Sequence, residues 1–191
     1  MTGPSTPPST YRFYGFAQAC LDPVAGDLVL VRTKDRIGGA IRAIERLRGG
    51  AEYAWCNHAA IVLNSGPSAY VAQAEAKGVT VTPLAELGAL DYAVVHFEMT
   101  REQRLAVVRF AEWSIGQGYG YLSIAADLFN ATFSLELSLG WGDRMVCSTQ
   151  ACRALERAGL IPDRSPYAVT PADLAEYADV TVPAPVKVRI K

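Results

Sequence analysis

Hydrophobic residues along this chain form short runs that alternate with stretches of helical spacing. The short runs are bounded by turn residues and predict strands over 27–32, 58–63, 70–75, 79–82 and 92–97. Apolar residues at helical spacing predict helices over 35–48, 100–115 and 147–158, with a last short helix from 170. Consecutive strands flanked by helices predict an α+β fold, with a mainly antiparallel sheet packed against helices.

The chain has 191 residues, a length that suits one domain. Its first ten residues are rich in proline, serine and threonine and carry no apolar periodicity. We therefore expect a disordered or loosely packed N-terminal tail over 1–15 and a single domain over 16–191.

Composition and charge argue against several classes of protein. A hydrophobic fraction of 50% excludes an intrinsically disordered chain, and a net charge of −1 argues against a globally basic nucleic-acid binder. The most apolar long stretch, 119–141, contains Asp127, Asn130 and Glu136, so we expect no integral membrane span. No secretory signal pattern is present, which makes a cytoplasmic location the default expectation. Composition leaves the oligomeric state open.

Cys147 is the first candidate for chemistry because it opens a predicted helix. A thiol there faces unpaired backbone N–H groups and the positive end of the helix dipole, which stabilise a thiolate. The same N–H groups can form an oxyanion hole. The alternative is a small buried hydrophobic residue, which is the commoner role of a lone cysteine.

His58 is the candidate base for this cysteine. It begins an apolar strand beside small alanines, which leaves room for a partner at the ring. Gln73 and Glu75 share one face of the next predicted strand, and either could contact the far imidazole nitrogen as the third member of a triad does. The alternatives are a histidine that caps a backbone carbonyl and a solvated hairpin end. His96 has no obvious partner and is interpreted as structural.

A metal site would use some of the same atoms. Cys56 and His58, with Cys147 and Cys152, could supply sulfur and nitrogen ligands. Neither pair has the spacing usual in zinc sites, so we expect no metal and no other cofactor.

Three motifs occur in an informative order: Asn57-His-Ala-Ala-Ile-Val-Leu63, then Gln73-Ala-Glu-Ala-Lys-Gly-Val79, and much later Val146-Cys-Ser-Thr-Gln150. This order resembles the permuted papain-like cysteine hydrolases of the NlpC type, in the YiiX-like branch, and more distantly the lecithin:retinol acyltransferase group. A Gly-Asp strand at 26–30, a glycine–tyrosine segment at 118–121 and a Thr-Pro helix at 170–174 are similar to other family segments.

The resemblance implies a permuted papain-like (NlpC-type) fold with Cys147 as nucleophile, His58 as base and Glu75 as the orienting residue. Tyr119, Tyr121 and Gln73 are expected to line the substrate cleft, and 119–141 is a candidate lid. The family often has Tyr-Asp at 119–120 and Ser-Glu at 148–149, where this chain has Tyr-Gly and Ser-Thr.

The expected reaction is hydrolysis of an amide bond, in a peptide or a peptidoglycan-stem-like substrate, through a thioacyl intermediate. Two alternatives stay open from the sequence. One is an acyl transferase or an esterase or lipase that acts on lipid-like acyl substrates. The other is a non-catalytic binding module that shares the fold.

Overall fold

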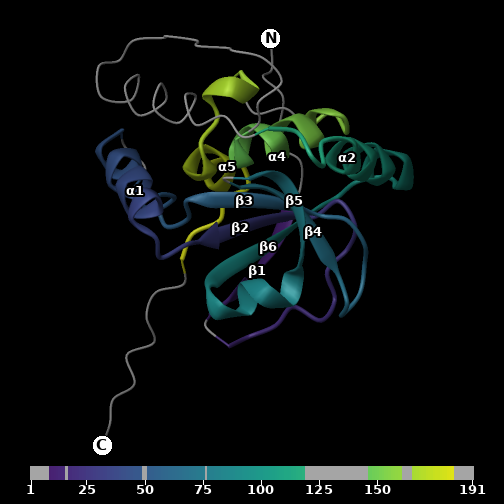
Figure 1. Ribbon diagram of the computed structural model, residues 1–191, viewed down its shortest axis with the longest axis horizontal. Coiled ribbons are helices and arrows are strands. Elements are labelled where there is room, and N and C mark those ends of the chain that lie inside the picture. The colour runs from purple at the N-terminus through teal and green to yellow at the C-terminus, as the bar shows by residue number, and fades with distance from the viewer. Residues whose placement is uncertain are drawn as a thin grey trace, which may run out of the picture.

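The computed structural model describes residues 9–15, 17–48, 51–75, 77–118, 146–160 and 165–182 (Figure 1). Within these ranges one sheet has the strand order β1-β6-β2-β3-β4-β5, and every neighbouring pair is antiparallel. The strands are β1 (Ser9–Tyr14), β2 (Leu28–Arg32), β3 (His58–Val62), β4 (Tyr70–Glu75), β5 (Gly78–Pro83) and β6 (Asp91–Phe97). The α+β class and the antiparallel sheet predicted from the sequence are confirmed.

Strand β1 lies inside the segment that we expected to be a loose tail. It pairs with β6 from Ser9 opposite Phe97 to Tyr14 opposite Tyr92, and the Tyr14 and Tyr92 rings stack with centroids 5.0 Å apart. Ring stacking and sheet hydrogen bonds stabilise this edge strand although most of its side chains are not buried. Residues 9–14 are therefore part of the sheet. Residues 1–8 lie outside the described ranges.

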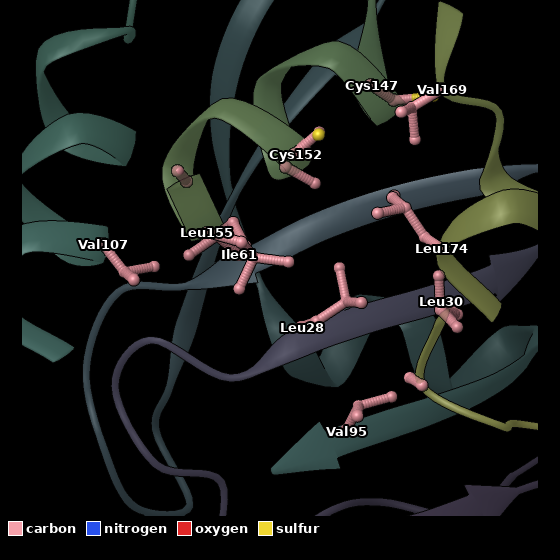
Figure 2. Packing of buried hydrophobic residues seen from close by; sticks show 14 of the residues in the cluster. Leu28, Leu30, Ile61, Val95, Val107, Cys147, Cys152, Leu155, Val169 and Leu174 are labelled. Carbon is pink, nitrogen blue, oxygen red and sulfur yellow. The ribbon is translucent and has the colours of Figure 1, made fainter. Parts of the chain in front are cut away.

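Three helices cover one face of the sheet: α2 (Arg101–Trp113), α4 (Cys147–Glu156) and α5 (Pro171–Tyr177), as Figure 1 shows. Leu155 of α4 packs in one buried cluster with Ile61 and Leu28 of the sheet (Figure 2). Alanines on both sides of this contact let the helix approach the strands closely; they are Ala59, Ala72, Ala151 and Ala154. The close approach brings the start of α4 to the start of β3.

A second cluster lies on the other face of the sheet. Val29 and Val31 of β2 pack there with Leu84 and Leu87 of a 3₁₀ helix, Leu84–Ala89. Because β2 is buried on both faces, its sequence is a continuous apolar run rather than an alternating one. Buried side chains therefore pack against both faces of the central strands.

Helix ends follow the signals in the sequence. Thr100 and Gln103 form a capping box at the start of α2, and Thr170 and Asp173 form another at the start of α5. Helix α1 (Arg36–Arg48) forms as predicted over 35–48. None of the helices in the described part of the chain has the length and apolar character needed to cross a membrane.

Candidate active site

Cys147 is the first residue of α4. It follows Val146, whose backbone is extended and whose side chain offers no capping oxygen. The first turn contains no acidic residue, so the positive end of the helix faces the thiol without a competing carboxylate. The side chain is 8% exposed. The predicted position of Cys147 at a helix N-terminus is thus what the structure shows.

The thiol of Cys147 and the imidazole of His58 form a hydrogen-bonded pair. Burial by itself raises the pKa of Cys147. The charge of His58 and its hydrogen bond to the sulfur, together with hydrogen bonds from the backbone N–H groups of Ala59 and Ser148, outweigh burial and lower that pKa. The site therefore favours a thiolate.

His58 shows the complementary shift. Burial alone would lower the pKa of the imidazole, but the charge of Cys147 and hydrogen bonds with Cys147 and Gln73 oppose burial, with a further contribution from the charge of Glu75. Together they raise the pKa of His58 to about 9. Opposite shifts in two touching groups are typical of a thiolate–imidazolium pair.

The far nitrogen of His58 contacts Gln73. The distance between His58 Nε2 and Gln73 Oε1 is 2.9 Å, and Gln73 is buried in the sheet. Glu75, which we expected against the imidazole, lies one step further out. Its Oε1 accepts a hydrogen bond from Gln73 Nε2 at 2.9 Å, and its side chain is exposed. The direct contact expected of Glu75 is therefore made by Gln73, which we had expected to line the cleft.

Two groups at the site were missed by the sequence reasoning. The Oγ1 atom of Thr82 accepts a hydrogen bond from Gln73 Nε2 at 3.1 Å, and the backbone N–H of Ala59 bonds the Cys147 sulfur. Pairing places Thr80 opposite Gln73, so Thr82 lies two residues further along the same face of β5. The two predicted strands over 70–75 and 79–82, which are separated by a short turn, were the signal that could have located Thr82.

The pKa shifts of Cys56 and Cys152 have the opposite direction from that of Cys147. Burial raises the pKa of Cys56 and raises the pKa of Cys152 to about 12. Cys152 is fully buried in the core between α4 and the sheet. Within the described ranges, no group of three or more histidine, cysteine or acidic residues could hold a metal ion.

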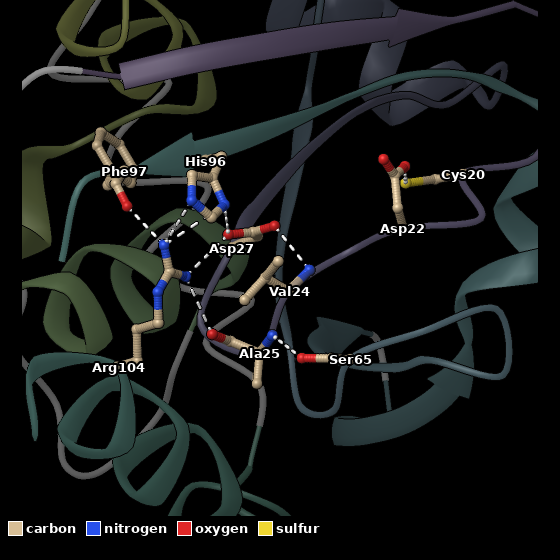
Figure 3. A network of polar contacts seen from close by, with 9 residues as sticks. All are labelled: Cys20, Asp22, Val24, Ala25, Asp27, Ser65, His96, Phe97 and Arg104. Atoms are coloured by element: carbon tan, nitrogen blue, oxygen red, sulfur yellow. Dashed lines mark hydrogen bonds and ion pairs between the residues drawn. The ribbon is translucent and has the colours of Figure 1, made fainter. Parts of the chain in front are cut away.

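His96 belongs to a separate cluster, shown in Figure 3. Its Nδ1 lies 3.0 Å from Oδ1 of Asp27, and the same oxygen lies 3.1 Å from Nη1 of Arg104. Arg104 also donates to the carbonyl of Phe97 at 2.6 Å. These contacts join the turn before β2 to β6 and α2, in agreement with the structural interpretation of His96.

Tyr119, Tyr121 and the candidate lid over 119–141 lie outside the described residues. The expectations for them stay predictions.

The comparison with protein families returns one match: the permuted papain-like amidase enzymes, YaeF/YiiX, C92 family, over residues 22–129. The match covers more than half of the chain and includes His58, Gln73 and Glu75. It ends before Cys147, so the place of Cys147 at the site comes from the geometry above. No curated protein matches the sequence. The chain belongs to the permuted papain-like cysteine amidases of the YaeF/YiiX, C92 family.

Proposed function

We propose that this amidase cleaves the amide bond of a peptide or a peptidoglycan stem through a thioacyl intermediate on Cys147. The observation that carries the proposal is the chain of contacts Cys147–His58–Gln73, in which the pKa of the thiol is lowered and that of the imidazole is raised. The amidase description of the family supports an amide as the scissile bond.

The reaction starts from the thiolate–imidazolium pair. The sulfur of Cys147 attacks the carbonyl carbon, a C–S bond forms, and the carbonyl electron pair moves onto oxygen. The C–N bond then breaks while His58 gives its proton to the leaving amine. In the second half a water molecule attacks the thioester and passes a proton to His58, and the C–S bond breaks. This restores the starting pair.

The negative charge on the carbonyl oxygen needs a fixed donor. The backbone N–H of Cys147 is at the first position of α4, where an N–H has no acceptor within the helix. We assign this N–H as the oxyanion donor, aided by the helix dipole. Gln73 takes the role of orienting partner of His58 in this scheme, with Glu75 outside it.

The test is turnover and acyl capture with a panel of substrates. It includes peptide amides, muropeptide stems and simple esters, and intact mass would detect an acyl group on the protein. We expect amide cleavage with the adduct on Cys147, and no turnover in Cys147→Ala or His58→Ala. Cys20→Ala is the matched control, because Cys20 lies in the other buried cluster and should keep full activity.

Two results would change the proposal. Amide turnover that persists in folded Cys147→Ala would remove Cys147 as the nucleophile. Ester turnover without amide turnover would favour the acyl-group alternative. Replacing Cys147 by alanine changes little volume, so the variant should lose less than about 1.5 kcal/mol of stability and remain folded for this comparison.

A further inference from the structure

We propose that Glu75 and Thr82 are positioning residues that orient the ring of His58 through the side-chain amide of Gln73. They hold that amide with its oxygen toward His58, and thereby keep the proton of the neutral imidazole on Nε2 and leave Nδ1 facing Cys147. The inference rests on the proposed roles of Cys147 and His58 and adds a second layer of residues to them.

The amide of Gln73 has two different ends, and its surroundings distinguish them. Its nitrogen donates to Glu75 Oε1 at 2.9 Å and to Thr82 Oγ1 at 3.1 Å, so both N–H groups have acceptors. A carboxylate can only accept hydrogen bonds. If the amide were rotated by half a turn, its oxygen would face the Glu75 carboxylate and the bond to Glu75 would be lost, whereas the Thr82 hydroxyl could donate to the amide oxygen instead. Gln73 is 3% exposed, so water would not readily replace the bond to Glu75.

The fixed amide then decides which imidazole nitrogen carries a proton. Gln73 Oε1 is an acceptor, so His58 Nε2, 2.9 Å away, must be the donor. Nδ1 remains for Cys147, where it can take the thiol proton. A rotated amide would present N–H groups to Nε2 and favour the opposite tautomer, in which Nδ1 already carries a proton and cannot act as the base.

The charged carboxylate of Glu75 lies at the outside of the site, and the neutral amide of Gln73 lies next to His58. Glu75 is exposed, while Gln73 is buried between it and His58. Glu75 is further held by Thr80, whose Oγ1 donates to Oε2 at 3.4 Å. A buried carboxylate directly beside the ring would pay a larger desolvation cost than this amide does. Glu75 therefore has to supply a hydrogen-bond acceptor for the amide of Gln73, and its negative charge is secondary for this role.

The acceptor requirement can be separated from charge by two replacements at one position. Glu75→Leu removes the acceptor and should lower kcat by about 10- to 100-fold, the usual effect of losing a group that orients a reacting residue. Glu75→Gln keeps a carbonyl acceptor and should retain most of the activity. Thr82→Val removes the hydroxyl acceptor and should reduce kcat, whereas Thr82→Ser keeps the hydroxyl and should keep the wild-type kcat. Lys77→Gln, an exposed charge change in the same hairpin, is the control and should have no effect.

The decisive readout is the tautomer of His58, which does not depend on turnover. The chain has 2 histidines, so nitrogen NMR of histidine-labelled protein gives few signals to assign. In a Cys147→Ala background the imidazole loses the partner that raises its pKa and is neutral at mildly alkaline pH. We expect a proton on Nε2 in this background, and a shift toward Nδ1 when Glu75→Leu is added.

Three results would overturn the inference: an unchanged tautomer in the Glu75→Leu background, unchanged kcat in folded Glu75→Leu, or equal losses in Glu75→Gln and Glu75→Leu. The last would mean that charge, and not orientation, is what Glu75 supplies. If the wild-type protein cleaves no amide, the proposed function fails, but the tautomer measurement still decides whether Glu75 fixes the tautomer of His58.

Discussion

At the scale of single residues, the site depends on how burial and charge compete. Burial disfavours the charged forms of both Cys147 and His58, yet their contact reverses both shifts. Each group supplies the charge that the other needs, so neither should hold its altered pKa alone. This mutual dependence makes the pair testable by removing one member.

The first prediction concerns the pH dependence of Cys147. Its thiolate forms above a lowered pKa, so iodoacetamide should label it rapidly at pH 6, and His58→Ala should abolish that advantage. Amide turnover also needs the His58 proton and should fall as pH rises through about 9. Mass spectrometry would follow each cysteine separately, with Cys56 and Cys152 as slow internal references. Labelling of Cys147 that rises only near the pH of an ordinary thiol would contradict the ion pair.

The second prediction separates the inner partner of His58 from the outer one. Gln73→Ala removes the amide that contacts the imidazole and should lower kcat by about 100-fold, more than Glu75→Ala does. His58→Ala should lower it further, because the base itself is lost. Steady-state kinetics on one amide substrate would rank the three variants. A fully active Gln73→Ala beside an impaired Glu75→Ala would reverse the assignment.

At the scale of elements, the β4–β5 hairpin holds the outer half of the site. Gly78 starts β5 with a φ of +111°, and a Cβ there would lie 2.5 Å from the backbone oxygen of Gln117. The N–H of Val79 donates to that same oxygen at 2.9 Å. The hairpin therefore needs glycine both for its backbone angle and for space. Any shift here would move Gln73 and Glu75 together.

This gives a third prediction with an internal comparison. Gly78→Ala should lower the free energy of unfolding by about 1–3 kcal/mol, because of backbone strain and the close contact. Gly39→Ala should instead raise it by about 1 kcal/mol, because Gly39 lies within α1 with open space around its Cβ position. Urea unfolding of both variants shows whether the free energy of unfolding falls in Gly78→Ala and rises in Gly39→Ala. Equal effects would show that the hairpin tolerates a side chain at position 78.

At the scale of the whole molecule, the buried ion pair of Asp27 joins parts that are distant in the sequence. Asp27 is 2% exposed and accepts from the N–H of Val24 as well as contacting Arg104 and His96 (Figure 3). Burial raises the pKa of Asp27, while the Val24 N–H, His96 and Arg104 oppose that effect. The contacts connect α2 to the sheet on which α4 also packs.

The fourth prediction follows from that connection. Asp27→Ala leaves the Arg104 charge without its buried partner and should cost about 3–5 kcal/mol. Asp22→Ala breaks an exposed pair with Arg12, which solvent screens, and should cost far less. Urea unfolding at neutral pH compares the two. A small loss in Asp27→Ala would mean that the network is not needed to hold α2 on the sheet.

The local signals in the sequence were sufficient for most elements and for two site residues. Apolar runs, capping residues and turns depend on neighbours within a few positions, and so 28–32, 58–62 and the start of α4 could be located from the sequence. A cysteine at a helix start and a histidine at a strand start are likewise local features. The order of the motifs indicated the family that the comparison then identified.

What the tertiary structure alone decided is the pairing between distant segments. Gln73 and Glu75 share a face of β4, and the sequence could not show which of them the ring of His58, on the neighbouring strand β3, would contact. Strand β1 carries no strong apolar pattern and is held by its partner β6, whose paired residues lie 78 to 88 positions away in the sequence. Hydrogen-bond register and side-chain reach depend on packing across the sheet, and no local pattern encodes them.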